Sequence, residues 1–134
     1  MLKFLAGALL FFLAPSLLAQ SPPPVRVLLQ TSFGPITIEV DVARAPITAA
    51  NFLRYVDAGA YNSGRFHRTV RLSNQPDKKV KIEVIQGGIK PTRSRIELPS
   101  IPLERTNQTG LAHTNGCVSM ARDGPDTATS DFFI

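Results

Sequence analysis

The sequence predicts a mainly β domain, either a barrel or a sandwich, on three observations. Short apolar runs recur at regular spacing along the chain. Turn-forming pairs such as Pro-Asp and Asn-Gly separate several of these runs. Only one stretch has the 3.6-residue periodicity of an amphipathic helix. With 134 residues, the chain has room for one domain.

The domain is predicted to open with two strands, the runs VRVLLQT and ITIEV, which the turn SFGP joins. In the second run Ile36, Ile38 and Val40 alternate with polar residues, so one face of this strand should be buried. A helix is expected within DVARAPITAANFLRYVDAGAY, where apolar residues fall at i, i+3, i+4 and i+7 from Ala49. Pro46 and Gly59 mark its two ends.

The second half of the domain is predicted to contain mostly strands and loops. GRFHRTVRL and VKIEVIQGG read as strands, separated by the polar loop or projecting hairpin SNQPDKK. Residues 89–110 contain three prolines and predict an irregular surface excursion. The pair Asn115-Gly116, between two short apolar runs, predicts a hairpin with a type I′ turn. The sequence stops within the strand DFFI, so we expect it to be a fragment of a longer protein.

The N-terminus has the layout of a secretory signal peptide. Lys3 precedes an apolar run, and the small residue Ala19 lies just before QSPPP. The run is short for a spanning helix and Pro15 interrupts it, so cleavage is favoured over an uncleaved anchor. The predicted organisation is a signal peptide over residues 1–20, a Pro-rich lead-in over 21–24 and an incomplete domain over 25–134. We expect an exported, periplasmic or secreted monomer without stable membrane insertion after cleavage.

Charge, cysteine and histidine content argue against several classes of function. The net charge of +5 is scattered and has no interleaved aromatic residues, so nucleic-acid binding is not predicted. Cys117, the only cysteine, lies in an apolar run and reads as a buried hydrophobe rather than a catalytic thiol. His67 and His113 read as structural residues because no third ligand lies at metal spacing. The sequence therefore predicts neither a metal nor a cofactor.

Four short motifs follow one another along the chain: FHR (66–68), IQGG (85–88), VSMAR-GP-T (118–127) and FFI (132–134). In this order and context they resemble the cyclophilin-type peptidyl-prolyl cis-trans isomerases. The earlier stretch FGPITIEVDVARAPITAANFLRYVDAGAY also resembles the family's first hairpin and helix. Each motif is weak alone, but together they cover roughly residues 25–134. The resemblance implies a closed antiparallel β-barrel with capping helices, whose C-terminal part is missing here, and proline-containing segments of unfolded or folding proteins as substrates.

The resemblance also implies roles for individual residues. Arg68, which closes FHR, matches the catalytic arginine of the family. Gln86, in IQGG, matches the glutamine that binds the substrate backbone. Ala121 matches a position that contacts the substrate backbone, and Phe133 matches one wall of the proline pocket.

Four candidate site positions depart from the family pattern. Val84 and Glu83 replace the usual methionine and phenylalanine of the pocket. Arg122 and Asp131 replace the usual asparagine and glutamine. Glu83 leaves two outcomes open: it faces solvent and the pocket lacks one wall, or it faces inward and pairs with Arg68.

The implied reaction needs neither a nucleophile nor a metal ion from the protein. An X-Pro bond isomerises slowly because the twisted state loses amide resonance. Acceleration to milliseconds needs about 10⁴-fold, or roughly 5.5 kcal/mol. Arginine suits the donor that would hydrogen-bond the freed prolyl nitrogen, but such a bond contributes only about 1.5–3 kcal/mol. The sequence therefore predicts an isomerase for exported proteins or, alternatively, a peptide-binding or chaperone module with weak or no turnover.

Overall fold

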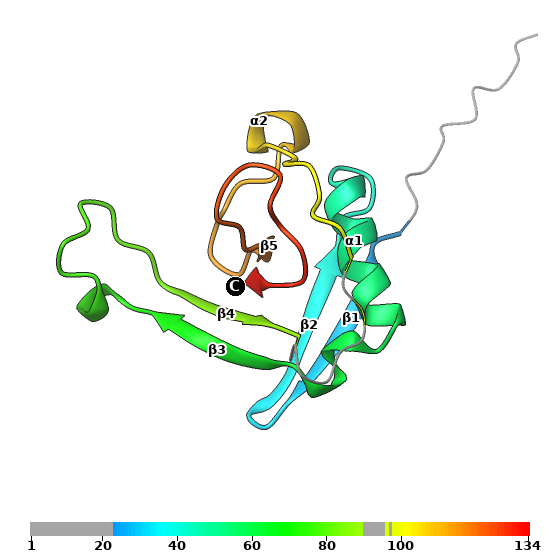
Figure 1. Cartoon of the computed structure of the whole chain (residues 1–134), viewed down its shortest axis with the longest axis horizontal. Coiled ribbons are helices and arrows are strands. Elements are labelled where there is room, and N and C mark those ends of the chain that lie inside the picture. Colours follow the sequence, from blue (N-terminus) through cyan, green and yellow to red (C-terminus); the bar gives the residue numbers. More distant parts are fainter. Residues whose placement is uncertain (1–22, 90–95, 97) are drawn as a thin grey trace, which may run out of the picture.

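The computed structural model describes residues 23–89, 96 and 98–134, and their fold is mainly β (Figure 1). The predicted signal peptide and the start of the Pro-rich lead-in lie outside these residues. In chain order the principal elements are β1 (Val25–Thr31), β2 (Gly34–Val40), α1 (Pro46–Asp57), β3 (Arg65–Val70), β4 (Val84–Gly88), α2 (Thr106–Thr109), β5 (Ser119–Met120) and β6 (Phe132–Phe133). Short 3₁₀ turns at Ala60–Ser63 and Leu72–Asn74 flank β3.

The strands form two antiparallel sheets. One is the β1–β2 hairpin, and the other has the order β3-β4-β6-β5. A closed barrel requires every strand to pair on both sides. Among the described residues, β1, β2, β3 and β5 each pair on one side only, so the structure shows two open sheets and not the expected closed barrel.

Helix α1 packs along the β1–β2 hairpin and receives its N-terminal cap from a distant residue (Figure 1). Its N-cap residue, Ala45, makes no side-chain cap bond, and Pro46 stands at the first turn. The Glu104 carboxylate accepts hydrogen bonds from the backbone N–H groups of Ile47 at 3.1 Å and Thr48 at 2.7 Å. A carboxylate at this end of a helix satisfies free N–H groups and complements the helix dipole.

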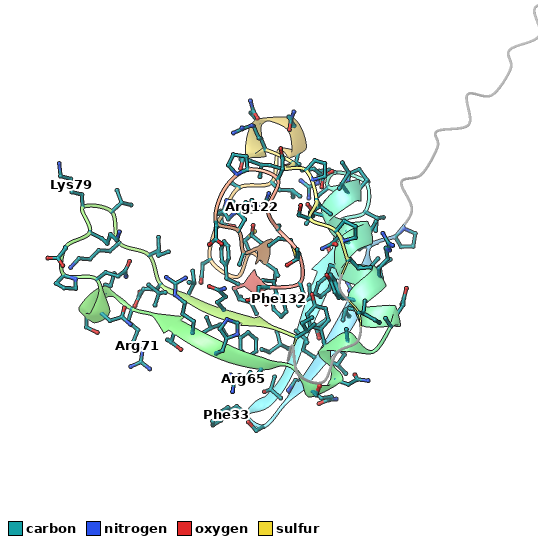
Figure 2. The ribbon with its side chains drawn as sticks, viewed as in Figure 1. Phe33, Arg65, Arg71, Lys79, Arg122 and Phe132 are labelled. Carbon is teal, nitrogen blue, oxygen red and sulfur yellow. The ribbon has the colours of Figure 1, made fainter. Side chains whose placement is uncertain are left out.

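The core lies between α1, β2 and the β5–β6 end of the second sheet. The Phe132 side chain is 3% exposed and meets the rings of Phe52, Tyr61 and Phe66 edge-on, with centroids 5.6–6.0 Å apart. The Tyr61 hydroxyl donates to the Ser130 carbonyl at 2.6 Å, and burial raises the pKa of Tyr61. Figure 2 shows Phe132 near the centre of the molecule. This aromatic cluster therefore connects β6 to α1 and β3.

Two of the predicted elements differ from those observed. β4 begins at Val84 rather than Val80, because the backbone N–H and C=O of Ile82 both bond the Gln75 side chain and leave the ladder. The turn at Asn115-Gly116 is present, closed by the bond from Cys117 N–H to the Thr114 carbonyl. It is not type I′, since of its two central residues only the glycine has positive φ. The predicted hairpin is also absent there, because β5 starts at Ser119 and pairs with β6.

The segment 89–110, predicted to be irregular, is described only in part. Its described residues include the isolated bridge between Ile101 and Ala128 and the single turn of α2. Across the described part of the chain, no helix has the length and apolar character needed to cross a lipid bilayer.

Candidate functional site

The candidate site is built on three neighbouring strands. Arg68 of β3 lies opposite Gln86 of β4, and Gln86 lies opposite Phe133 of β6. Residues directly opposite one another in a sheet point to the same face. These three predicted site residues come from three motifs and lie up to 65 positions apart in the sequence. The sheet brings them into one row.

A register shift in β3 sets the direction of Arg68. Phe66 pairs with Gly87 and Arg68 pairs with Gln86, so His67 is an extra residue in β3. A bulge of this kind bends the strand and re-aims the side chains next to it. Phe66 turns into the aromatic core, whereas His67 and Arg68 are both exposed.

Arg68 begins a chain of polar contacts. Its Nη1 donates to Gln86 Oε1 at 3.0 Å, and Gln86 Nε2 lies 3.4 Å from Asp131 Oδ2. His67 Nε2 lies 3.3 Å from the same carboxylate oxygen. Because arginine only donates and an ionised carboxylate only accepts, these neighbours fix which way the Gln86 amide faces. The amide oxygen is thereby held toward the guanidinium.

The glycine pair after Gln86 makes room for this chain of contacts. A Cβ atom on Gly88 would lie 1.8 Å from Asp131 Oδ1, closer than any real contact. A Cβ atom on Gly87 would lie 2.9 Å from the Phe66 ring. The IQGG motif thus does more than end a strand: its glycines let Asp131 and Phe66 approach the backbone of β4.

The other side of the row is partly apolar. Phe133 is half-buried and stacks with the His113 ring at a centroid distance of 6.0 Å. His113 Nε2 lies 3.1 Å from the Ser119 hydroxyl, which orients the ring. Ala121 follows β5, and its N–H donates to the Asp131 carbonyl at 2.8 Å. Ala121 is therefore held beside the β6 end of the row.

The structure places the remaining predicted residues differently from one another. Val84 is half-buried at the start of β4, two positions before Gln86 and on the same face. Glu83 is exposed and precedes β4, while the hydrogen bond of Arg68 goes to Gln86.

Arg122 and Phe133 both line a cavity of about 740 Å³ between β2, α1 and residues 103–122. Arg68 is not among the residues that line this cavity. Among the described residues, Arg122 Nη1 is shielded from solvent and has no hydrogen-bond partner.

Sequence reasoning missed the contribution of His67 and Asp131 to the site. The resemblance identifies Asp131 only as a departure from the family pattern, and the sequence predicts a structural role for His67. Their contact depends on the bulge in β3, which the sequence does not predict, and it joins residues 64 positions apart. The sequence offers only two separate signals: a carboxylate that departs from the family pattern, and a histidine next to the candidate arginine.

The comparisons with known proteins all point to one family. Residues 26–134 match the family model of the cyclophilin type peptidyl-prolyl cis-trans isomerases. The chain is 38% identical over 107 residues to a peptidyl-prolyl cis-trans isomerase of Acinetobacter baylyi, covering 79% of this chain and 52% of the relative. It is 36% identical over 110 residues to peptidyl-prolyl cis-trans isomerase A of Dickeya dadantii, covering 81% and 53%. It is also 38% identical over 114 residues to peptidyl-prolyl cis-trans isomerase 10 of Caenorhabditis elegans, covering 82% of this chain and 64% of the relative. The chain thus spans about half the length of these bacterial relatives.

Proposed function

The chain belongs to the cyclophilin-type peptidyl-prolyl cis-trans isomerase family, and from this premise we propose that it accelerates the cis-trans isomerisation of X-Pro peptide bonds. The row of Arg68, Gln86 and Phe133 across β3, β4 and β6 carries the proposal. It places an exposed guanidinium, an oriented amide and an aromatic ring on one face of the sheet.

Arg68 is proposed to act on the twisted state of the X-Pro bond. In that state the prolyl nitrogen loses amide resonance and its lone pair can accept a hydrogen bond. Arg68 is exposed, and among the described residues its side chain bonds only Gln86, through Nη1; the other guanidinium N–H groups can therefore donate to a ligand. Because planar cis and trans bonds offer no such lone pair, this bond would form only in the transition state, as catalysis requires.

The remaining stabilisation would come from binding the proline ring and the peptide backbone. A bond from Arg68 supplies about 1.5–3 of the roughly 5.5 kcal/mol needed. We assign the ring to Phe133 and Val84, whose half-buried side chains lie on the Arg68 face of the sheet. The backbone of the substrate is assigned to Gln86 and to the residues after β5, Ala121 and Arg122.

A binding module with weak or no turnover is the second candidate. The observation that favours it is Glu83, which is exposed just before β4 and supplies no apolar wall next to Arg68. A pocket with fewer walls can still hold a proline ring but restrains its acyl side less. Such a protein would bind X-Pro segments of unfolded chains and release them unchanged.

The full-length protein is expected to accelerate exchange in a short peptide with one Ala-Pro bond. Exchange spectroscopy by NMR measures the cis-trans rate, and a titration on the same peptide measures binding. Saturable binding with accelerated exchange supports the isomerase. Saturable binding at the uncatalysed rate selects the binding module, and a peptide that neither binds nor exchanges faster contradicts both.

We also propose that the protein acts on exported polypeptides. The support is sequence residues 1–20, with Lys3 before an apolar run and Ala19 before QSPPP. Mass spectrometry of the mature protein should then find an N-terminus near Gln20 or Ser21. Recovery of the protein from the cytoplasm with residues 1–20 intact would contradict this.

A further inference from the structure

Residues 71–83, between β3 and β4, form an excursion that projects beyond the rest of the molecule (Figure 1). Figure 2 shows Lys79 at its outer end and Arg71 near its base. Three of its apolar side chains are open to solvent: Leu72 is 52% exposed, Val80 81% and Ile82 52%. Long connections that expose apolar residues commonly serve binding, since the fold itself gains nothing from them.

The excursion is held in shape by the Gln75 side chain. Gln75 Nε2 lies 2.7 Å from the Arg71 carbonyl and 2.6 Å from the Ile82 carbonyl, and Oε1 accepts from the Ile82 N–H at 3.2 Å. Asn74 adds a bond from its side-chain amide to the Thr69 carbonyl at 3.0 Å. The two arms of the excursion are thus joined before any ligand arrives. A preorganised surface loses less conformational entropy on binding than a free loop would.

A groove of about 440 Å³ runs between this excursion and β3. One of its walls is continuous with the candidate site, because it includes Arg68 and the two residues that follow it. The other wall includes Val80 and Ile82, so exposed apolar side chains face a hollow rather than a flat surface.

The charge around the groove is mainly positive. The excursion carries four basic residues, Arg71, Lys78, Lys79 and Lys81, against two acidic ones, Asp77 and Glu83. Of the basic residues, Lys78 lines the groove itself. The combination of cations with open apolar side chains matches a ligand that alternates acidic and apolar side chains. A positively charged ligand would be repelled here.

We propose that this groove is a second subsite, which binds the peptide segment flanking the proline and selects substrates with acidic and apolar residues there. The inference rests on the proposed function, since it takes the peptide held at Arg68 as the ligand that continues into the groove. A membrane surface fits less well. A bilayer is flat, whereas Arg68, Val80 and Ile82 line a concavity with Asp77 on its wall.

The test compares two peptides that differ only in charge. One has an Ala-Pro bond with glutamates on both sides, and the other has glutamines at the same places. Wild-type protein is expected to show a severalfold higher kcat/KM for the glutamate peptide at low salt. Lys78→Glu should lower the ratio of the two values about fivefold, and Asp77→Asn should raise it. The preference should shrink at about 0.5 M salt, where charges are screened.

Arg54→Glu is the matched control, because it makes the same charge change on the exposed side of α1. It should leave the ratio unchanged. Equal handling of the two peptides, or an equal fall of the ratio in Lys78→Glu and Arg54→Glu, would overturn the inference. So would binding to phosphatidylglycerol vesicles that Lys78→Glu abolishes while the peptide ratio stays at one.

The subsite and the proposed function can fail separately. If neither peptide exchanges faster with the wild-type protein, the isomerase proposal fails. Titration then still decides the groove: the glutamate peptide should bind several times more tightly than the glutamine peptide, and Lys78→Glu should remove the difference. Equal dissociation constants would overturn the subsite whatever the exchange rates are.

Discussion

Replacement of Arg68 by alanine is expected to lower kcat/KM for Ala-Pro exchange by about ten- to a hundredfold. The lost interaction is a charged hydrogen bond to the prolyl nitrogen, which contributes roughly 1.5–3 kcal/mol. Since that bond would form only in the twisted state, kcat should fall more than KM rises. Exchange spectroscopy at several peptide concentrations separates the two constants.

Arg65→Ala provides the control for this experiment. Arg65 is an exposed arginine at the start of the same strand, opposite Gly88 and not opposite a residue of the row. Its replacement should leave the rate of exchange unchanged. An Arg68→Ala protein that folds normally and retains the wild-type kcat would remove Arg68 from the mechanism. Arg68→Lys should restore only part of the rate, because lysine keeps the charge but lacks the rigid fork of donors.

Replacement of Phe132 by alanine is expected to lower the free energy of unfolding by about 3–5 kcal/mol. The ring is 3% exposed and touches three other aromatic rings from α1, the segment after it and β3. Its loss would leave a cavity where β6 meets the rest of the core. Urea denaturation, monitored by circular dichroism, measures this change in the free energy of unfolding. A loss of this size is a large part of the free energy of unfolding of a typical domain.

Two further variants keep this prediction testable if Phe132→Ala does not fold. Phe132→Leu retains most of the volume and should cost at most about 1.5 kcal/mol. Phe33→Ala removes a ring that is fully exposed at the tip of the β1–β2 hairpin, and it should change stability by less than about 0.5 kcal/mol. Equal losses for Phe33→Ala and Phe132→Ala would contradict the assignment of Phe132 to the core.

Local patterns predicted the elements whose stability is local. α1 follows from its apolar stripe and from Pro46 and Gly59, and the β1–β2 hairpin follows from alternation in β2. The extent of β4 could not be predicted, because Gln75 takes the backbone groups of Ile82 out of the ladder. The alternation of VKIEV is present either way, and only the tertiary contact decides where pairing stops.

The candidate site was predictable as a list of residues but not as an arrangement. The motifs predict Arg68, Gln86 and Phe133 as site residues, and the strand register places them in one row. The contact of His67 with Asp131 depends on a one-residue bulge. The alternation of side chains along a regular strand does not predict such an insertion. The position of Glu83 outside β4 likewise follows from where the strand begins and not from its neighbours in sequence.

The cap on α1 has a consequence for the order of events during synthesis. Glu104 follows Thr48 by 56 residues, so the helix leaves the ribosome well before the group that completes its N-terminus. At about 5–20 residues per second, the interval is roughly 3–11 s. An isolated helix of 12 residues is marginally stable in water. The nascent chain therefore passes through a period in which α1 lacks the cap that Glu104 supplies in the folded protein.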